Sequence, residues 1–232
     1  MRNHQRVLSW LETELESGRL LIGQRLPGER AMAEYLQVSR ASVREGVRVL
    51  EAMGMVRANV GSGPDAGTII TANPETALAA ALRLHIASSH LPVSDIVQTR
   101  LLLETWSVAH AGADSPAMAD AAELLVRMDD PRLPADEFLV LDAQFHVALA
   151  AAAGNILIGA MMASLRESIA AYTRQLTRSL PVWDRTATRL RQEHHGIHAA
   201  IVRGASAEAS VQVSDHIQGF YREAGMGEPL AS

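Results

Sequence analysis

The sequence of 232 residues contains no cysteine and no lysine. The absence of cysteine excludes a disulfide framework and any metal site built from thiolates. All 21 basic residues are arginine, a bias of composition that does not by itself indicate a function.

No apolar N-terminal stretch precedes a cleavage site of small residues, so we expect no targeting segment. The longest uncharged run, residues 147–164, is nearly long enough to cross a bilayer, but Gly154 and Asn155 interrupt it. We therefore expect two buried helical segments joined by a turn, a cytoplasmic protein and no membrane partner.

Residues 25–50 have the pattern of two short helices joined by a tight turn. A Pro-Gly pair ends the preceding turn and Glu29 suits the positive end of a helix, which predicts a helix over 29–36. A turn at 37–39 follows, and Ser39 is a natural N-cap for the second helix. The apolar positions of that helix recur at spacings of four and three and define its inward face: Val43, Val47, Leu50 and Met53.

The opposite face of the second helix is basic and carries Arg40, Ser42, Arg44 and Arg48. Arginine forks match guanine edges and phosphate oxygens, and a recognition helix presents its N-terminal residues to the major groove. Arg40 and Arg44 lie where contact with bases is possible. Three arginines alone would favour a solvated basic face, but the turn and the flanking chain reverse this preference toward DNA binding.

Two short β-prone runs, at residues 55–60 and 68–71, follow this helix and flank a glycine-rich stretch. Gly54 closes the helix before them, so the segment is typical of a hairpin. A helix-turn-helix followed by a hairpin is a winged helix. Its glycine-rich tip can approach DNA closely because no Cβ intervenes.

The P-x-E-R, V-S-R-x-S-V-R-E and G-x-G…G-T-I-I motifs resemble the GntR family of bacterial transcription regulators over about the first seventy residues. The resemblance implies contacts of arginines with operator bases or adjacent phosphates, of Ser42 with a phosphate, and of the wing with DNA. An N-terminal arginine could add a phosphate contact. The implied DNA-binding residues are Arg2, Arg30, Ser39, Arg40, Ser42, Arg44 and Gly61.

Charge differs between the two parts of the chain. Residues 1–72 hold nine arginines against eight acidic residues (+1), and the rest hold twelve against eighteen (−6), which sum to the net charge of −5. A near-neutral DNA-binding domain must place its arginines on one face. We expect a winged helix-turn-helix domain over 1–72, a linker over 73–78 and an all-helical domain over 79–225.

The pattern beyond Asn73 and Pro74 is helical throughout, with no convincing strand. Breaks near 89–92, 112–116, 129–134, 154–155, 180–181 and 204 divide it into six or seven helices. We expect an antiparallel helical bundle, so that the whole chain is mainly α with a small hairpin wing.

Three of these helices turn polar residues toward the bundle interior. Asp142 and His146 lie one turn apart in an apolar stripe, and His194 and His216 lie in the inward stripes of the last two helices. Each histidine alone could be a hydrogen-bonded core residue. Together, three imidazoles and one carboxylate suit Zn²⁺, Ni²⁺, Mn²⁺ or Fe²⁺.

The D-x-x-F-H pattern at 142–146, followed by E-H at 193–194 and by a last histidine, resembles the FCD effector domain of the FadR branch of the GntR family. The resemblance covers about residues 75–222. It implies a divalent cation, usually zinc, with open positions that face a small carboxylate effector. The implied ligands are Asp142, His146, His194 and His216, with His195 as an alternative to His194.

Arg100 falls on the inward stripe of its helix, where a buried guanidinium must meet an anion. It either forms a structural ion pair with Glu104 or Asp142, or it clamps an effector carboxylate. The stretch R-L-L-L-E at 100–104 resembles the arginine-bearing helix of FCD domains, which favours the clamp. Tyr172 either lines the effector pocket or belongs to an ordinary core stripe.

The sequence thus predicts a homodimeric repressor that binds a pseudopalindromic operator, because one winged helix reads one half-site. The segments G-S-G-P…G-T-I-I, M-D-D-P-x-L-P and F-H-V resemble lactate-responsive repressors of actinobacteria, which implies L-lactate as the effector. Effector binding to the metal and Arg100 would shift the population of domain orientations and weaken DNA binding.

Two other classes of function fit parts of the pattern. A metal-dependent enzyme with an attached DNA-binding module could use the open metal positions to activate water, but no inward glutamate or second histidine stands out as a general base. An architectural DNA binder would use its helical half only to dimerise and would need no effector.

Overall fold

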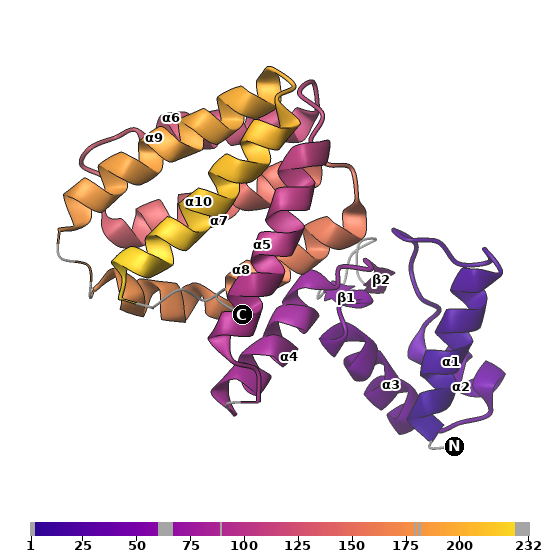
Figure 1. The fold of residues 1–232 in the computed structure, drawn as a ribbon. Helices are drawn as coiled ribbons and strands as arrows, with labels where there is room; N and C mark the ends of the chain where they lie inside the picture. The colour runs from indigo at the N-terminus through magenta and orange to yellow at the C-terminus, as the bar shows by residue number, and fades with distance from the viewer. Residues whose placement is uncertain (1–2, 60–66, 89, 179, 181, 226–232) are drawn as a thin grey trace. The chain divides into compact units, whose positions relative to one another are not determined.

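The structure is a computed structural model that describes residues 3–59, 67–88, 90–178, 180 and 182–225. These residues form ten helices and one two-stranded sheet (Figure 1), which confirms the predicted mainly helical class. The chain divides into two compact units, Met1–Leu78 and Ala79–Ser232.

The first unit contains three helices and a hairpin: α1 (Asn3–Glu16), α2 (Glu29–Leu36), α3 (Arg40–Ala52), β1 (Val56–Asn59) and β2 (Gly67–Ile70). Helix α2 begins and ends where the sequence predicts, whereas α1 was not predicted. Helices α1 and α3 pack closely at Val7 and Gly46. A Cβ at position 46 would lie 2.6 Å from the Cβ of Val7, so this close approach requires glycine.

Helix α3 begins as its sequence predicts. The Ser39 hydroxyl accepts a hydrogen bond from the backbone N–H of Ser42 at 3.1 Å, which satisfies a donor of the first turn. Val43 and Leu50 are buried in the core of the unit, but Met53 is 50% exposed, so the inward face is one residue shorter than the spacing indicated. The N-terminal end and the basic face of α3 lie in solvent.

The predicted hairpin is also present. Strands β1 and β2 are antiparallel and pair Val56 with Ile70, two buried residues. Gly54 follows α3 with a φ of 71°, and a Cβ there would lie 1.9 Å from the carbonyl oxygen of Asn73. Glycine is therefore required where the chain leaves the helix. The predicted wing tip lies outside the described residues.

The second unit is built from seven helices: α4 (Glu75–Ala87), α5 (Val93–His110), α6 (Pro116–Met128), α7 (Ala135–Ala152), α8 (Ile156–Thr177), α9 (Trp183–Val202) and α10 (Ser206–Glu223). The predicted linker over 73–78 overlaps the first turn of α4, whose residues 75–78 belong to the first unit. Each of the six predicted breaks falls between two helices.

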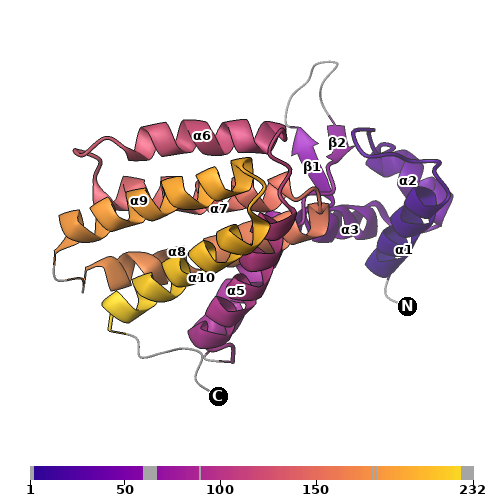
Figure 2. The ribbon, with the colours of Figure 1, turned by 45° about the horizontal axis from the view of Figure 1, so that its top comes forward.

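Helix α7 is central to the second unit and packs against α5, α6 and α8, while α10 packs against α5 and α9. Figure 2 shows α9 and α10 running side by side. The main core lies among these helices and includes Phe138, Phe145 and Leu149 of α7. This packing brings the inward stripes of α7, α9 and α10 together.

No helix in the described part of the chain is long and apolar enough to cross a membrane. The uncharged run 147–164 is divided between α7 and α8, as predicted. Asn155 begins α8, since its side-chain oxygen accepts hydrogen bonds from the backbone N–H groups of Leu157 and Ile158.

Candidate metal centre and DNA-binding face

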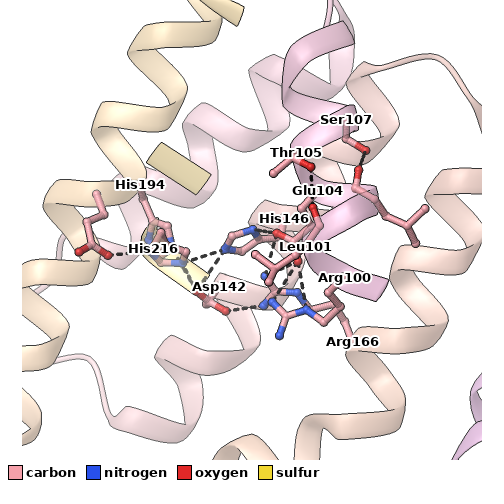
Figure 3. A network of polar contacts seen from close by, with 12 residues as sticks. Arg100, Leu101, Glu104, Thr105, Ser107, Asp142, His146, Arg166, His194 and His216 are labelled. Carbon is pink, nitrogen blue, oxygen red and sulfur yellow. Dashed lines mark hydrogen bonds and ion pairs between the residues drawn. The ribbon is translucent and has the colours of Figure 1, made fainter. Parts of the chain in front are cut away.

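Four buried side chains from three helices converge in the second unit (Figure 3). Helix α7 supplies Asp142 and His146, α9 supplies His194 and α10 supplies His216. One nitrogen or oxygen atom of each lies within 4.8 Å of those of the other three. The four residues that the sequence selects are therefore brought together by the fold.

The distances among these atoms suit one small cation. The Nε2 atom of His194 lies 3.0 Å from Asp142 Oδ1, and the Nε2 atoms of His146 and His216 lie 3.7 and 3.9 Å from the same oxygen. Those two Nε2 atoms are 3.2 Å apart. Ligands placed about 2.1 Å from a tetrahedral zinc ion would be separated by about 3.4 Å.

Two carboxylates hold the outer nitrogens of the histidines. Glu104 pairs with His146 Nδ1, and Glu193 Oε2 lies 2.8 Å from His216 Nδ1. Since an ionised carboxylate only accepts hydrogen bonds, a neutral ring beside one would carry its proton on Nδ1 and a lone pair on Nε2. Two lone pairs then face each other across 3.2 Å, an arrangement that a cation would stabilise.

His194 supports the same fit. It is fully buried, and neither ring nitrogen makes a hydrogen bond within the described residues. Burial and the neighbouring His216 lower the pKa of His194 to about 3, against the attraction of Asp142. Burial also lowers the pKa of His216. Neutral imidazoles and an ionised aspartate form a donor set that fits a divalent cation.

Asp142 keeps its charge through a second network. Burial acts to raise the pKa of Asp142, but Arg166 and the neighbouring rings of His146 and His194 hold it well below its usual range. Arg166 donates from Nη1 to Asp142 Oδ2 at 2.7 Å, and its Nη2 lies 3.4 Å from Glu104 Oε1. Arg166 therefore connects the candidate metal ligand Asp142 to Glu104, the carboxylate that pairs with a second candidate ligand.

Arg100 is buried as predicted, and its partner is Glu104, with Nη2 3.0 Å from Oε1. Its Nη1 donates to the hydroxyl of Tyr221 at 3.0 Å. Burial acts to lower the pKa of Arg100, but Tyr221, Glu104 and Asp142 raise it. Of the two predicted ion-pair partners of Arg100, Glu104 is the one observed, whereas Asp142 pairs with Arg166.

A small cavity of about 30 Å³ adjoins these groups. It has room for only one or two water molecules. Its lining consists of Arg100, Leu139, Asp142, Arg166, Thr173, Leu190, His216, Ile217, Phe220 and Tyr221. Tyr172 is absent from this lining and packs, partly buried, against the main core, which is the second of its two predicted alternatives.

The alternative ligand His195 lies away from the cluster. Its side chain is 50% exposed, and its Nε2 lies 3.0 Å from Asp129. The helical spacing decides this, because His194 continues the buried stripe of Leu190 and Ile197, whereas its neighbour is turned out.

Three further residues of the site were not assigned to it from the sequence: Arg166, Glu193 and Glu104, of which the last was expected only as a possible partner of Arg100. Glu104 stands four residues after Arg100 and shares its buried helix face, but its contact with His146 was not predicted. Arg166 stands four residues after Met162 in a buried stripe, which was a usable signal. Glu193 precedes His194, and only the packing of α9 on α10 places it against His216.

The candidate DNA-binding face lies on α2 and α3. Arg40 is exposed at the start of α3, and Arg44 is exposed and paired with Glu29 at 3.0 Å. Ser42 is partly buried, and its hydroxyl lies 2.9 Å from that of Ser39. These side chains share the solvent side of one short helix.

Arg30 of α2 is exposed and pairs with Glu34 at 3.0 Å. Two further predicted contacts, Arg2 and Gly61, lie outside the described residues.

Known families match both units. The family described as "Bacterial regulatory proteins, gntR family" matches residues 3–64, and the FCD domain family matches residues 95–219. The chain is 30% identical over 221 residues to the HTH-type transcriptional regulator LutR of Bacillus subtilis, a match that covers 90% of this chain and 98% of that protein.

The chain is also 26% identical over 223 residues to the Exu regulon transcriptional regulator of Escherichia coli, covering 94% of this chain and 82% of that protein. Among solved structures, Streptococcus agalactiae GntR superposes with a TM-score of 0.63 at 24% identity and covers 95% of this chain and 99% of that one, which supports the fold. The matched families and relatives are regulators of transcription, not enzymes. This chain therefore belongs to the GntR family, in the FadR subfamily that joins a helix-turn-helix domain to an FCD domain, and is a transcriptional regulator.

Proposed function

We propose that the protein is a homodimeric repressor whose affinity for a pseudopalindromic operator is controlled by a small carboxylate effector bound beside a divalent metal. Zinc is the first candidate metal, with nickel or manganese as alternatives. The carrying observation is the convergence of three histidines and Asp142 next to two buried arginines.

Charge balance supports an anionic effector. The two arginines, Arg100 and Arg166, balance the two carboxylates, Glu104 and Asp142, when the histidines are neutral. A divalent cation would add two positive charges to this buried cluster. An effector carboxylate would offset part of that excess and could accept hydrogen bonds from the same guanidiniums.

L-lactate is our candidate effector because its carboxylate and hydroxyl oxygens could both approach a metal that expands its coordination beyond the four protein ligands. The cavity of about 30 Å³ is smaller than such a molecule, so binding would require side chains or helices to move. An effector that favours the rearranged state shifts the population toward it, which is what control of DNA binding requires.

We assign DNA binding to residues 1–72, and metal binding, effector binding and dimerisation to residues 79–225. In this proposal the repressor acts in the cytoplasm. Bases and phosphates are contacted by arginines and serines of α2 and α3, supplemented by the N-terminus and the wing: Arg2, Arg30, Ser39, Arg40, Ser42, Arg44 and Gly61. Two copies are needed because each winged helix reads one half-site.

Metal analysis of the purified protein, followed by operator binding at one fixed salt concentration, tests this function. We expect bound zinc, and we expect L-lactate to weaken operator binding of the zinc-loaded protein. If L-lactate and related hydroxy- and dicarboxylates all leave the affinity unchanged, effector control fails. If the protein holds no metal and His146→Ala does not alter regulation, an architectural role replaces it.

The Arg100→Ala variant separates the two roles of this arginine. Loss of the effector response with a retained fold supports a carboxylate clamp, whereas misfolding supports a structural ion pair. Arg83→Ala is the matched control, because Arg83 forms an exposed ion pair with Glu167 in the same unit.

A further inference from the structure

Two carboxylates hold the outer nitrogens of candidate metal ligands, but their surroundings differ. Glu193, behind His216, has a side chain that is 29% exposed, and it pairs with Arg189 at 2.6 Å. Glu104, behind His146, has a side chain that is only 2% exposed. The first can exchange partners with water, whereas the second depends entirely on its protein neighbours.

The neighbours of Glu104 come from both parts of the proposed effector site (Figure 3). Its Oε2 pairs with His146 Nδ1. Its Oε1 accepts from Arg100 Nε at 3.1 Å and lies 3.4 Å from Arg166 Nη2. Arg166 Nη2 also lies 3.5 Å from Oε2, so one carboxylate contacts a metal-ligand histidine and two cavity-lining arginines.

We propose that Glu104 is a positioning residue shared by the metal and the arginine pair, a role that rests on the proposed metal site. It holds the proton of His146 on Nδ1, which leaves Nε2 free for the metal, and it aligns Arg100 and Arg166 at the cavity. A metal ion that shifts the ring of His146 consequently shifts Glu104 and, through it, Arg100. The metal and the anion-binding arginines are then mutually dependent.

The Glu104→Gln variant tests this directly because glutamine has only one acceptor oxygen. Two guanidiniums compete for that oxygen more strongly than one imidazole N–H. The amide N–H would then face His146 Nδ1, and the ring would carry its proton on Nε2, where it blocks the metal. The substitution keeps the shape of the side chain and changes which ring nitrogen is available.

The measurement is Zn²⁺ affinity by competition with a chromophoric chelator, together with the ¹⁵N shifts of the histidine rings in the metal-free protein. For Glu104→Gln we expect a 10- to 100-fold loss of Zn²⁺ affinity, the usual range for such outer partners, and a His146 ring protonated on Nε2. Glu193→Gln is the matched control. It should weaken Zn²⁺ binding through His216 and leave the His146 tautomer unchanged.

The link to the arginines has its own readout, the Nε–H resonance of Arg100, which Arg100→Gln assigns. In the wild-type protein, saturating Zn²⁺ should shift this resonance because both groups share Glu104. The shift should persist in Glu193→Gln and vanish in Glu104→Gln.

The outcomes separate this inference from the proposed function. A wild-type protein that binds no Zn²⁺ overturns both. A wild-type protein that binds Zn²⁺ but carries the His146 proton on Nε2 without metal, or shows no Zn²⁺-dependent shift at Arg100, overturns the role of Glu104 alone. Equal Zn²⁺ affinity of Glu104→Gln and wild type does the same. The wild-type measurements decide the matter even if the variant does not fold.

Discussion

Arginine is used in opposite ways in the two units. In the first unit, Arg30 and Arg44 are exposed and pair with glutamates that are themselves in solvent. In the second unit, Arg100 and Arg166 are 5% and 9% exposed and pair with buried carboxylates. Exposed ion pairs contribute about 0–1 kcal/mol and exchange readily, whereas a buried charge cannot lose its partner cheaply. Burial, not residue type, therefore separates arginines available to DNA from arginines held in a network.

The largest expected effect comes from removing a buried arginine. Arg166→Ala leaves Asp142 without its closest cation and removes one of the two guanidiniums that pair with Glu104. We therefore expect a loss of about 3–5 kcal/mol in the free energy of unfolding. Urea unfolding in the presence of a chelator measures it. Arg83→Ala, which breaks the exposed pair with Glu167, should cost less than about 1 kcal/mol. Equal losses would remove the distinction between buried and exposed arginines.

The same contrast between buried and exposed side chains applies to two adjacent histidines. The pKa of His194 is about 3 in the folded protein and 6.5 in its ordinary state, so the unfolded chain binds the proton more tightly. The contribution of the neutral ring to the free energy of unfolding is complete above about pH 6.5. It is lost as the pH falls toward about 3, by at most about 1.4 kcal/mol per pH unit. The lowered pKa of His216 acts in the same direction.

The free energy of unfolding of the metal-free protein, measured between about pH 7 and pH 5, gives the slope of stability against pH. His194→Gln should reduce the slope, while His195→Gln, at the exposed neighbour, should leave it unchanged. A slope that is insensitive to His194→Gln would mean that this buried ring does not oppose protonation.

An exposed arginine should affect binding and not folding. Arg40→Ala should weaken operator binding by about 1–3 kcal/mol at fixed salt and relax specificity at one base pair if it reads a base. The free energy of unfolding should change by less than about 0.5 kcal/mol, because the side chain is in solvent. A uniform loss across all DNA sequences would instead make Arg40 a phosphate contact.

The smallest expected effect tests the exposed pair itself. Glu29→Gln releases Arg44 from its ion pair and removes a negative charge beside the DNA-binding face. We expect stability to change by less than about 1 kcal/mol and DNA affinity to rise, with a steeper dependence on salt. A large loss of stability would show that this pair fixes α2 against α3.

Local signals predicted much of the fold and the four candidate ligands. Ser39, Gly54 and Asn155 stand where helices begin or end, and their effect needs only a few neighbouring residues. The inward stripes of α7, α9 and α10 follow from helical spacing alone, which also favoured His194 over His195. Helix α1 was missed, although Val7 and Leu11 mark its buried face.

The sequence by itself determined which residues face the interior, because a helix repeats every 3.6 residues whatever surrounds it. Only the tertiary structure decided which of these residues meet. Arg166 reaches Asp142 and Glu104, and Glu193 reaches His216, across separate helices. Such pairings depend on how segments far apart in the chain pack, and that packing also set the small volume of the cavity.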